Sequence, residues 1–91
     1  MARIIIPSVL RSFTNRTSEL FYDETTVNGI IAALIEAYPD LRPHILDDKG
    51  QLRSVVNVYV DNADVRTLQG TDTPLTEAST VLIIPSISGG W

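Results

Sequence analysis

Hydrophobic residues recur with a helical period in one segment of the chain. Between residues 27 and 38 the apolar side chains fall on a single stripe of an α-helix. The stripe consists of Val27, Ile30, Ile31, Leu34, Ile35 and Tyr38. Thr25 or Thr26 can cap the N-terminus of this helix, and Pro39 ends it because proline cannot continue a helix. Asp40 can cap a second, short helix that runs to Leu46.

Two further segments are continuously apolar. Residues 3–6 and residues 80–84 are rich in β-branched side chains, and each segment is followed by a proline. Such runs are typical of central strands that are buried on both faces of a sheet. Residues 18–22 follow the first run after a short polar loop, which predicts a second strand antiparallel to the first.

The remaining strand signal is an alternation of apolar and polar positions. Residues 56–60 alternate valine with asparagine and tyrosine, which predicts a half-buried strand that ends at the turn residues Asp61 and Asn62. Residues 65–70 are predicted to form a short edge strand, and residues 71–79 a loop or a helical turn.

These elements predict an α+β domain with one main helix packed on one face of a mixed sheet of four to five strands. If the first and last strands are both central they are neighbours, and they run parallel because the intervening helix acts as a crossover. The predicted domain covers residues 1–85, and residues 86–91 project beyond it as a free C-terminal tail.

Composition excludes several classes of function. The chain has 91 residues, enough for one domain, and a net charge of −4 with one lysine and six arginines, which argues against binding to nucleic acid. There is no cysteine, so disulfides and thiolate chemistry are excluded. No apolar run approaches the length of a membrane span, and the run near the N-terminus is too short for a signal peptide. We therefore expect a cytoplasmic protein.

No constellation of residues predicts an enzyme or a metal site. The single histidine, His44, is expected at the surface, and Asp47 and Asp48 are expected in a solvated turn. Asp61, Asn62 and Asp64 superficially suggest calcium, but no downstream Glu or Gly completes the spacing of a calcium loop, and turn chemistry explains these residues better. The scattered arginines indicate a soluble surface unless the fold gathers them; they are Arg11, Arg16, Arg42, Arg53 and Arg66.

The end of the chain is the remaining candidate. It reads SISGGW, with Gly89 and Gly90 after a spacer of Ser86, Ile87 and Ser88 that follows Pro85. Two glycines near a terminus are weak evidence alone, because termini are often rich in small residues. Their weight comes from their position after the last predicted strand.

Three motifs resemble one family along nearly the whole chain. They are IPSVLR at residues 6–11, VNVYVDNADVR at residues 56–66, and VLIIP at residues 81–85 followed by Gly89 and Gly90. In this order they resemble the ubiquitin-like sulfur carriers of the ThiS/MoaD family, most closely the subgroup that serves cysteine biosynthesis. The resemblance implies a β-grasp fold and a carrier protein that is not itself an enzyme.

The resemblance also implies the chemistry of the tail. A partner adenylating enzyme would use ATP and magnesium to adenylate the carboxylate of Gly90, and a sulfur donor would convert the adenylate to a thiocarboxylate. The thiocarboxylate would then deliver sulfur to a partner synthase. Residues without a Cβ suit a tail that passes down a narrow channel, because the backbone can approach closely and adopt any φ and ψ. This chain would bind no cofactor of its own.

Two features depart from the family pattern. Glu77, Ala78 and Ser79 replace a turn that often contains glycine, and Trp91 follows the glycine that should be terminal. Because the Gly90–Trp91 amide removes the carboxylate that adenylation needs, we expect a precursor from which a zinc-dependent metallopeptidase of the deubiquitinase-like (JAMM) kind removes Trp91. The alternatives are an inactive paralogue or a residue added in cloning.

Two other functions remain open. A ubiquitin-like modifier joined to protein lysines through Gly90 would share the tail chemistry, and a plain β-grasp interaction domain would have an inert tail. For docking to partners we expect the sheet face opposite the helix, with tail contacts from Pro85 to Ser88 and an anchor at Ile87.

Overall fold

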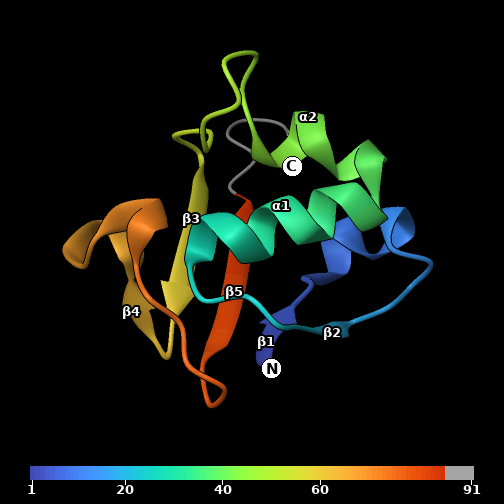
Figure 1. The fold of residues 1–91 in the computed structure, drawn as a ribbon. Helices are drawn as coiled ribbons and strands as arrows, with labels where there is room; N and C mark the ends of the chain where they lie inside the picture. The colour runs from blue at the N-terminus through green and yellow to red at the C-terminus, as the bar shows by residue number, and fades with distance from the viewer. Residues whose placement is uncertain (86–91) are drawn as a thin grey trace.

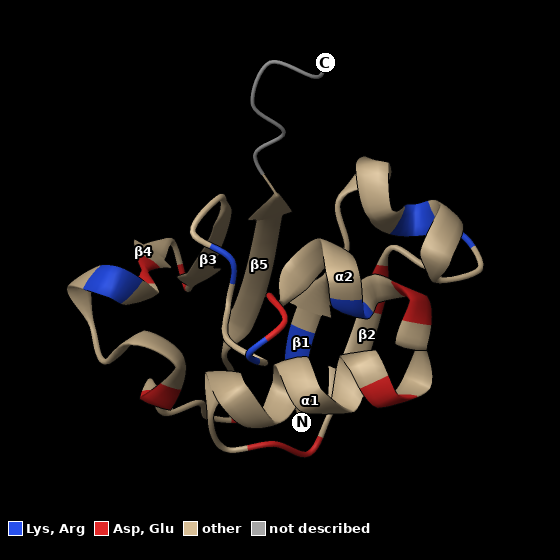
Figure 2. Cartoon of the chain, turned by 90° about the horizontal axis from the view of Figure 1, so that it is seen from above, with Lys and Arg blue, Asp and Glu red and all other residues tan. Residues whose placement is uncertain are grey.

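A mixed five-stranded sheet with one long helix across it forms the body of the molecule (Figures 1 and 2). The computed structural model describes residues 1–85, so the predicted tail of residues 86–91 lies outside the described residues. The strands and α-helices are β1 (Ala2–Ile5), β2 (Glu19–Tyr22), α1 (Val27–Ala37), α2 (Arg42–Ile45), β3 (Val56–Val60), β4 (Ala63–Asp64) and β5 (Thr80–Pro85). Short 3-10 helices connect them: η1 (Ser8–Phe13), η2 (Pro39–Leu41), η3 (Val65–Thr67) and η4 (Gly70–Asp72).

The strand order is β2-β1-β5-β3-β4, which places the first and last strands of the described chain side by side at the centre. β1 and β5 run parallel, with Ile4 opposite Val81, whereas β1–β2 and β3–β5 are antiparallel. The predicted parallel central pair is therefore confirmed. A consequence for function is that Pro85 lies at the end of the sheet opposite to Met1.

Helix α1 begins and ends where the sequence predicts. The Thr26 hydroxyl accepts a hydrogen bond from the backbone N–H of Gly29 at 3.0 Å, so Thr26 is the N-cap, and Pro39 follows directly after the C-cap Tyr38. The buried side of the helix is formed by Val27, Ile30, Ile31 and Leu34. The predicted second helix exists as the short pair η2 and α2. The predicted cap was wrong, because Asp40 lies within η2 and no side-chain hydrogen bond caps either helix.

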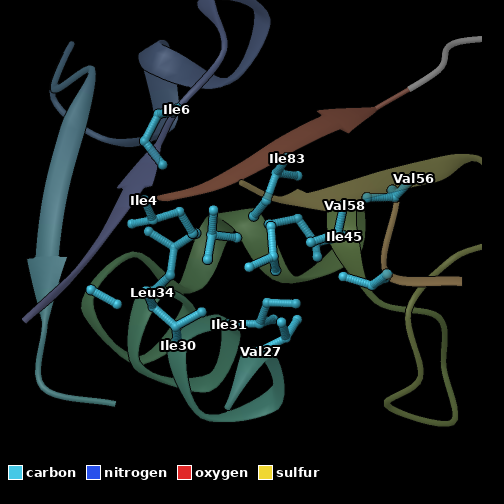
Figure 3. Packing of buried hydrophobic residues seen from close by; sticks show 14 of the residues in the cluster. Ile4, Ile6, Val27, Ile30, Ile31, Leu34, Ile45, Val56, Val58 and Ile83 are labelled. Atoms are coloured by element: carbon cyan, nitrogen blue, oxygen red, sulfur yellow. The ribbon is translucent and has the colours of Figure 1, made fainter. Parts of the chain in front are cut away.

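The core lies between α1 and one face of the sheet (Figure 3). It includes Ile4, Val58, Val81 and Ile83 from the strands, and Leu41 and Ile45 close it from the side of η2 and α2. Burying an aliphatic side chain of this size stabilises the fold by roughly 1.5–3 kcal/mol. The sheet and its covering helix therefore form one cooperative unit.

The prediction that β1 and β5 are buried on both faces was wrong. In β1, Ala2 and Ile4 are buried while Ile5 is only half-buried, and in β5 Leu82 is half-buried while Ile84 is exposed. Helix α1 covers only one face of the sheet, and no other described element covers the second face in the way that α1 covers the first (Figure 2). The runs of isoleucine and leucine thus place an apolar surface on the outside of the molecule.

The predicted edge strand at residues 65–70 was also wrong. The edge strand is β4, two residues long, and a tight hairpin turn at Asp61 and Asn62 joins it to β3. Both turn residues have positive φ, 49° and 74°, as a type I′ turn requires. The carboxylate of Asp64 accepts a hydrogen bond from the N–H of Arg66, which turns the chain into η3 instead of extending the strand.

The turn before β5 forms without glycine. The hydroxyl of Ser79 accepts a hydrogen bond from the N–H of Thr76 at 2.9 Å, and the Thr76 hydroxyl accepts one from the N–H of Ala78. Side-chain hydroxyls thus replace the glycine-containing turn of the family pattern.

No helix within residues 1–85 is long and apolar enough to cross a membrane.

Candidate functional site

The candidate site begins at the end of β5. Pro85 is the last described residue and lies opposite Val56, and Ile84 lies opposite Asn57. Of the predicted site residues, only Pro85 falls within the described chain. The others lie outside it: Ser86, Ile87, Ser88, Gly89, Gly90 and Trp91.

The uncovered face of the sheet, which we call the open face, leads to this end. The strand register places Phe21, Ile5, Leu82 and Ile84 on the open face, and we call these four residues the apolar strip. Phe21 is 53% exposed and Ile84 39% exposed. Exposed apolar residues that gather on one face mark a surface for interaction. The strip runs from β2 across β1 to the last residues of β5.

A shallow hollow of about 400 Å³ lies on the open face. Its lining consists of Arg3, Ile5, Tyr59, Asp61, Asn62, Thr80 and Leu82. Polar contacts fix its rim: the Arg3 guanidinium forms an ion pair with Glu19 at 2.9 Å and donates to the Thr80 hydroxyl at 3.3 Å. Asp61 accepts a hydrogen bond from the N–H of Thr80 at 2.9 Å. The hollow is therefore bounded by a fixed network at the start of β5.

Three of the scattered arginines lie on segments that flank the other end of β5. The Arg11 Nε donates to the carbonyl of Ile6, directly after β1, and a guanidinium N–H of Arg53 donates to the carbonyl of Pro43. We call Arg11, Arg53 and Arg66 the arginine rim.

Arg66 is the most firmly held member of the rim. Its guanidinium donates to the Asn57 side chain at 2.7 Å and to the carbonyls of Ser54 and Val56 at 3.0 and 3.1 Å. The Val56 carbonyl lies in β3 beyond the two residues that pair with β4, and Ser54 precedes the strand. Arg66 thus takes the place of a neighbouring strand at the start of β3. The sequence analysis missed this role; the only signal was the DVR motif, since it places Arg66 directly after the edge strand.

The other candidate residues have structural roles. His44 is exposed and packs its ring on Phe13, with the ring centroids 4.5 Å apart. The Asp47 carboxylate accepts hydrogen bonds from the N–H groups of Lys49 and Gln51, as expected for a turn. Within residues 1–85, no three His, Asp or Glu side chains lie close enough together to hold a metal ion.

Among residues 1–85, one titratable group has a clearly shifted pKa. Burial raises the pKa of the Tyr22 phenol above its usual value of 10.0, and the neighbouring Tyr38 adds to the rise. Tyr22 lies on the core side of β2, away from the end of β5. Its shift therefore belongs to the packing of the fold and not to the candidate site.

The fold and the candidate site define the class of this protein. A mixed sheet with a parallel central pair and one helix across a single face is the ubiquitin-like β-grasp architecture. The chain belongs to the ThiS family, whose pattern matches residues 4–90 and so reaches from β1 to the second glycine.

Known proteins of similar sequence and structure agree with this assignment. The chain is 29% identical to the sulfur carrier protein CysO of Mycobacterium tuberculosis over 89 residues, 96% of each chain. It superposes on a chain of the Amycolatopsis orientalis BexX/CysO complex with a TM-score of 0.87 and 26% identity, covering 99% of this chain and 100% of that one. Small archaeal modifier protein 1 of Methanosarcina acetivorans gives a TM-score of 0.85 and 26% identity, covering 98% and 95%.

These comparisons confirm the predicted family, its cysteine-biosynthesis subgroup and the β-grasp fold. They also confirm a carrier protein in place of an enzyme, since the curated relatives are named sulfur carriers. One relative is found in a complex with a second protein, which supports a role that depends on partners.

Proposed function

We propose that this chain carries sulfur as a thiocarboxylate on Gly90 for the biosynthesis of cysteine or a related sulfur-containing metabolite or cofactor. The observation that supports the proposal most directly is the match to the ThiS family over residues 4–90, which ends at Gly90. β5 brings the chain to the end of the sheet at Pro85, and four residues separate Pro85 from Gly90.

The proposed loading has two steps, both performed by partner enzymes. A carboxylate oxygen of Gly90 attacks the α-phosphorus of ATP, held with magnesium by an adenylating enzyme, and pyrophosphate leaves. Hydrosulfide from a sulfur donor then attacks the acyl carbon, and the bond between this carbon and the AMP oxygen breaks. AMP leaves, and the products on the protein side are the thiocarboxylate of Gly90 and one proton. The acceptor synthase consumes the thiocarboxylate.

Loading requires a free carboxylate on Gly90. In the given sequence this carboxyl group is part of the amide to Trp91, so the bond must first be hydrolysed. We propose that a zinc-dependent metallopeptidase adds water to this amide and releases tryptophan. The processing site is thus the Gly90–Trp91 bond, and the protein works in the cytoplasm with these partners.

The open face is the surface that we propose for docking to the adenylating enzyme. It carries the apolar strip, whose last member, Ile84, directly precedes Pro85. A partner that covers the strip would bury the exposed side chains of Phe21 and Ile84 and receive residues 86–90 at the same time. Such docking would use the face of the sheet that α1 does not cover.

Mass spectrometry of the protein from the cytoplasmic fraction of its native cells tests the proposal. The expected species ends at Gly90 and shows the mass increase of one oxygen replaced by sulfur. Material that always retains Trp91, together with no ATP–pyrophosphate exchange for a chain ending at Gly90 in extracts of those cells, would reject the proposal.

Substitution of Gly90 by alanine gives a second test. Gly90→Ala should abolish sulfur loading because the added Cβ obstructs close approach of the backbone in a narrow channel. The free energy of unfolding should be unchanged. Ala78→Gly is a matched control in the turn before β5, and it should leave loading intact. A large loss of stability in Gly90→Ala would show that this residue belongs to the fold.

The similarity to small archaeal modifier protein 1 favours a second candidate function. Conjugation of Gly90 to lysines of other proteins would use the same activation and then an amine in place of hydrosulfide. Digests of native proteins should contain diglycine remnants on lysine if this function operates. An inert interaction domain would give neither the thiocarboxylate nor the remnants.

A further inference from the structure

The arginine rim surrounds the point at which the chain leaves the sheet. Ile6, whose carbonyl binds Arg11, follows the β1 residue that pairs with Leu82, and Val56, whose carbonyl binds Arg66, lies opposite Pro85. The Arg53 carbonyl accepts a hydrogen bond from the N–H of the same Val56. Seen from above, segments that carry Lys and Arg lie on both sides of β5 (Figure 2).

The charges of this rim are available to a partner. Within the described part of the chain, neither Arg11 nor Arg53 has a carboxylate within 4.0 Å, and the Asp64 carboxylate is 3.9 Å from the guanidinium of Arg66. Each rim guanidinium is fixed by a backbone carbonyl, which holds the group in place, and for Arg11 and Arg53 no described carboxylate neutralises the charge. Groups held in this way lose little conformational entropy when a partner binds.

Negative charge gathers at the opposite end of β1 and β5. Asp61 binds the N–H of Thr80 at the start of β5, and Glu77 lies three residues before it. Asp23 and Glu24 directly follow β2, whose last residue pairs with Ala2. The chain as a whole carries a net charge of −4, so fixed positive charge near Pro85 departs from its average composition.

We infer that the arginine rim docks against an acidic protein surface, formed by Asp and Glu side chains around the opening that receives residues 86–90. The inference rests on the proposed function, since it concerns the partner that takes up the tail. Fixed positive groups near Pro85 attract an acidic partner to this end of β5, which raises the association rate.

An acidic peptide tests the rim directly. Acetylated and amidated hexaglutamate is titrated into the isotope-labelled full chain at low ionic strength, and the amide resonances are followed by NMR. We expect shifts at Ile6, Arg53, Val56 and Arg66, and a dissociation constant that rises with salt. The reason is that the screening length falls from about 30 Å at 0.01 M to about 8 Å at 0.15 M salt.

Matched charge removals locate the binding. Arg11→Gln and Arg53→Gln should each weaken the peptide about two- to fivefold, the size of an exposed ion pair. Arg66 is left unchanged because it also covers the edge of β3. Arg3→Gln removes the same charge near the start of β5 and should leave the affinity unchanged.

Three results would overturn the inference. They are equal weakening by Arg3→Gln, shifts confined to the end that holds Asp61 and Glu77, and binding of inorganic tripolyphosphate at the rim without binding of hexaglutamate. The last result would mean that the rim contacts a nucleotide in place of a protein. A fourth outcome separates the two proposals. If hexaglutamate binds at the rim but the native protein never carries a thiocarboxylate, the proposed function is rejected and the acidic partner of the rim is retained.

Discussion

The two faces of the sheet carry similar apolar residues but differ in how far these residues are buried. Ile83 and Ile84 are adjacent in β5, yet Ile83 is fully buried under α1 while Ile84 is 39% exposed on the open face. Ile4 and Ile5 of β1 repeat the contrast. An isoleucine thus stabilises the fold on one face, whereas on the other face it forms an exposed surface that a partner could bury. The difference lies in what covers the strand and not in the residue type.

The largest expected effect separates the two faces by stability. Ile83→Ala should lower the free energy of unfolding by about 2–5 kcal/mol, because a cavity forms among fully buried residues. Ile84→Ala, one residue further along β5, should lower it by less than about 1 kcal/mol. Urea unfolding of both variants measures the difference. Equal losses would mean that the open face contributes to folding as much as the covered face.

The next effect separates the faces by binding. Phe21→Ala at the end of the apolar strip should weaken binding to the adenylating partner by about 30-fold, the size expected for an aromatic anchor of an interface. The unfolding midpoint should change little because Phe21 is 53% exposed. Leu68→Ala removes an exposed apolar side chain outside the strip and serves as the control. A comparable loss of binding in Leu68→Ala would show that the apolar strip is not the specific docking surface.

A smaller effect concerns the helix that covers the core. Thr26→Ala removes the N-cap of α1 and should lower the free energy of unfolding by about 1 kcal/mol. Thr25→Ala, at the preceding and exposed position, should be nearly neutral. Binding through the open face should stay unchanged in both variants, because α1 lies on the opposite face. Weakened binding in Thr26→Ala would show that the two faces are coupled.

The smallest effect is a dependence on pH at the edge of the covered face. The pKa of Tyr22 is raised in the folded protein, so the fold favours the neutral phenol. Its contribution to stability is complete below pH 10 and is lost as the pH rises through the raised pKa, because the unfolded chain releases its proton first. Thermal unfolding across this range should show a fall in Tm that is smaller in Tyr22→Phe. An identical fall in both proteins would assign it to other groups.

Local patterns predicted the framework of the fold. The stripe from Val27 to Tyr38, with Thr26 and Pro39 at its ends, is enough to define α1 because period and caps are local signals. The parallel pair of β1 and β5 followed from the order of elements. The uncovered face did not follow, because a run such as Ile4-Ile5-Ile6 is apolar both in a strand buried on two faces and in one that binds a partner.

The candidate site also has one part that local sequence patterns predict and one part that they do not. The motif before Gly90 identifies the tail, since glycine and its spacing can be read along the chain. The arginine rim could not be predicted, because Arg11, Arg53 and Arg66 are distant in sequence and come to the same end of the sheet only through the pairing of β1, β5 and β3. The edge strand was misplaced since the side chain of Asp64 bends the chain at Arg66, which outweighs the strand propensity of Val65.

The parallel pairing of β1 and β5 also determines how the protein responds to mechanical force. A pull on the segment after Pro85 against a held N-terminus acts along two adjacent strands in opposite directions. The hydrogen bonds between Arg3–Ile5 and Thr80–Leu82 are then loaded together in shear, and none is opened before the others. A pull on Pro85 against Ala2 therefore has to break these hydrogen bonds together, whereas a load that unzips a hairpin breaks its hydrogen bonds one after another.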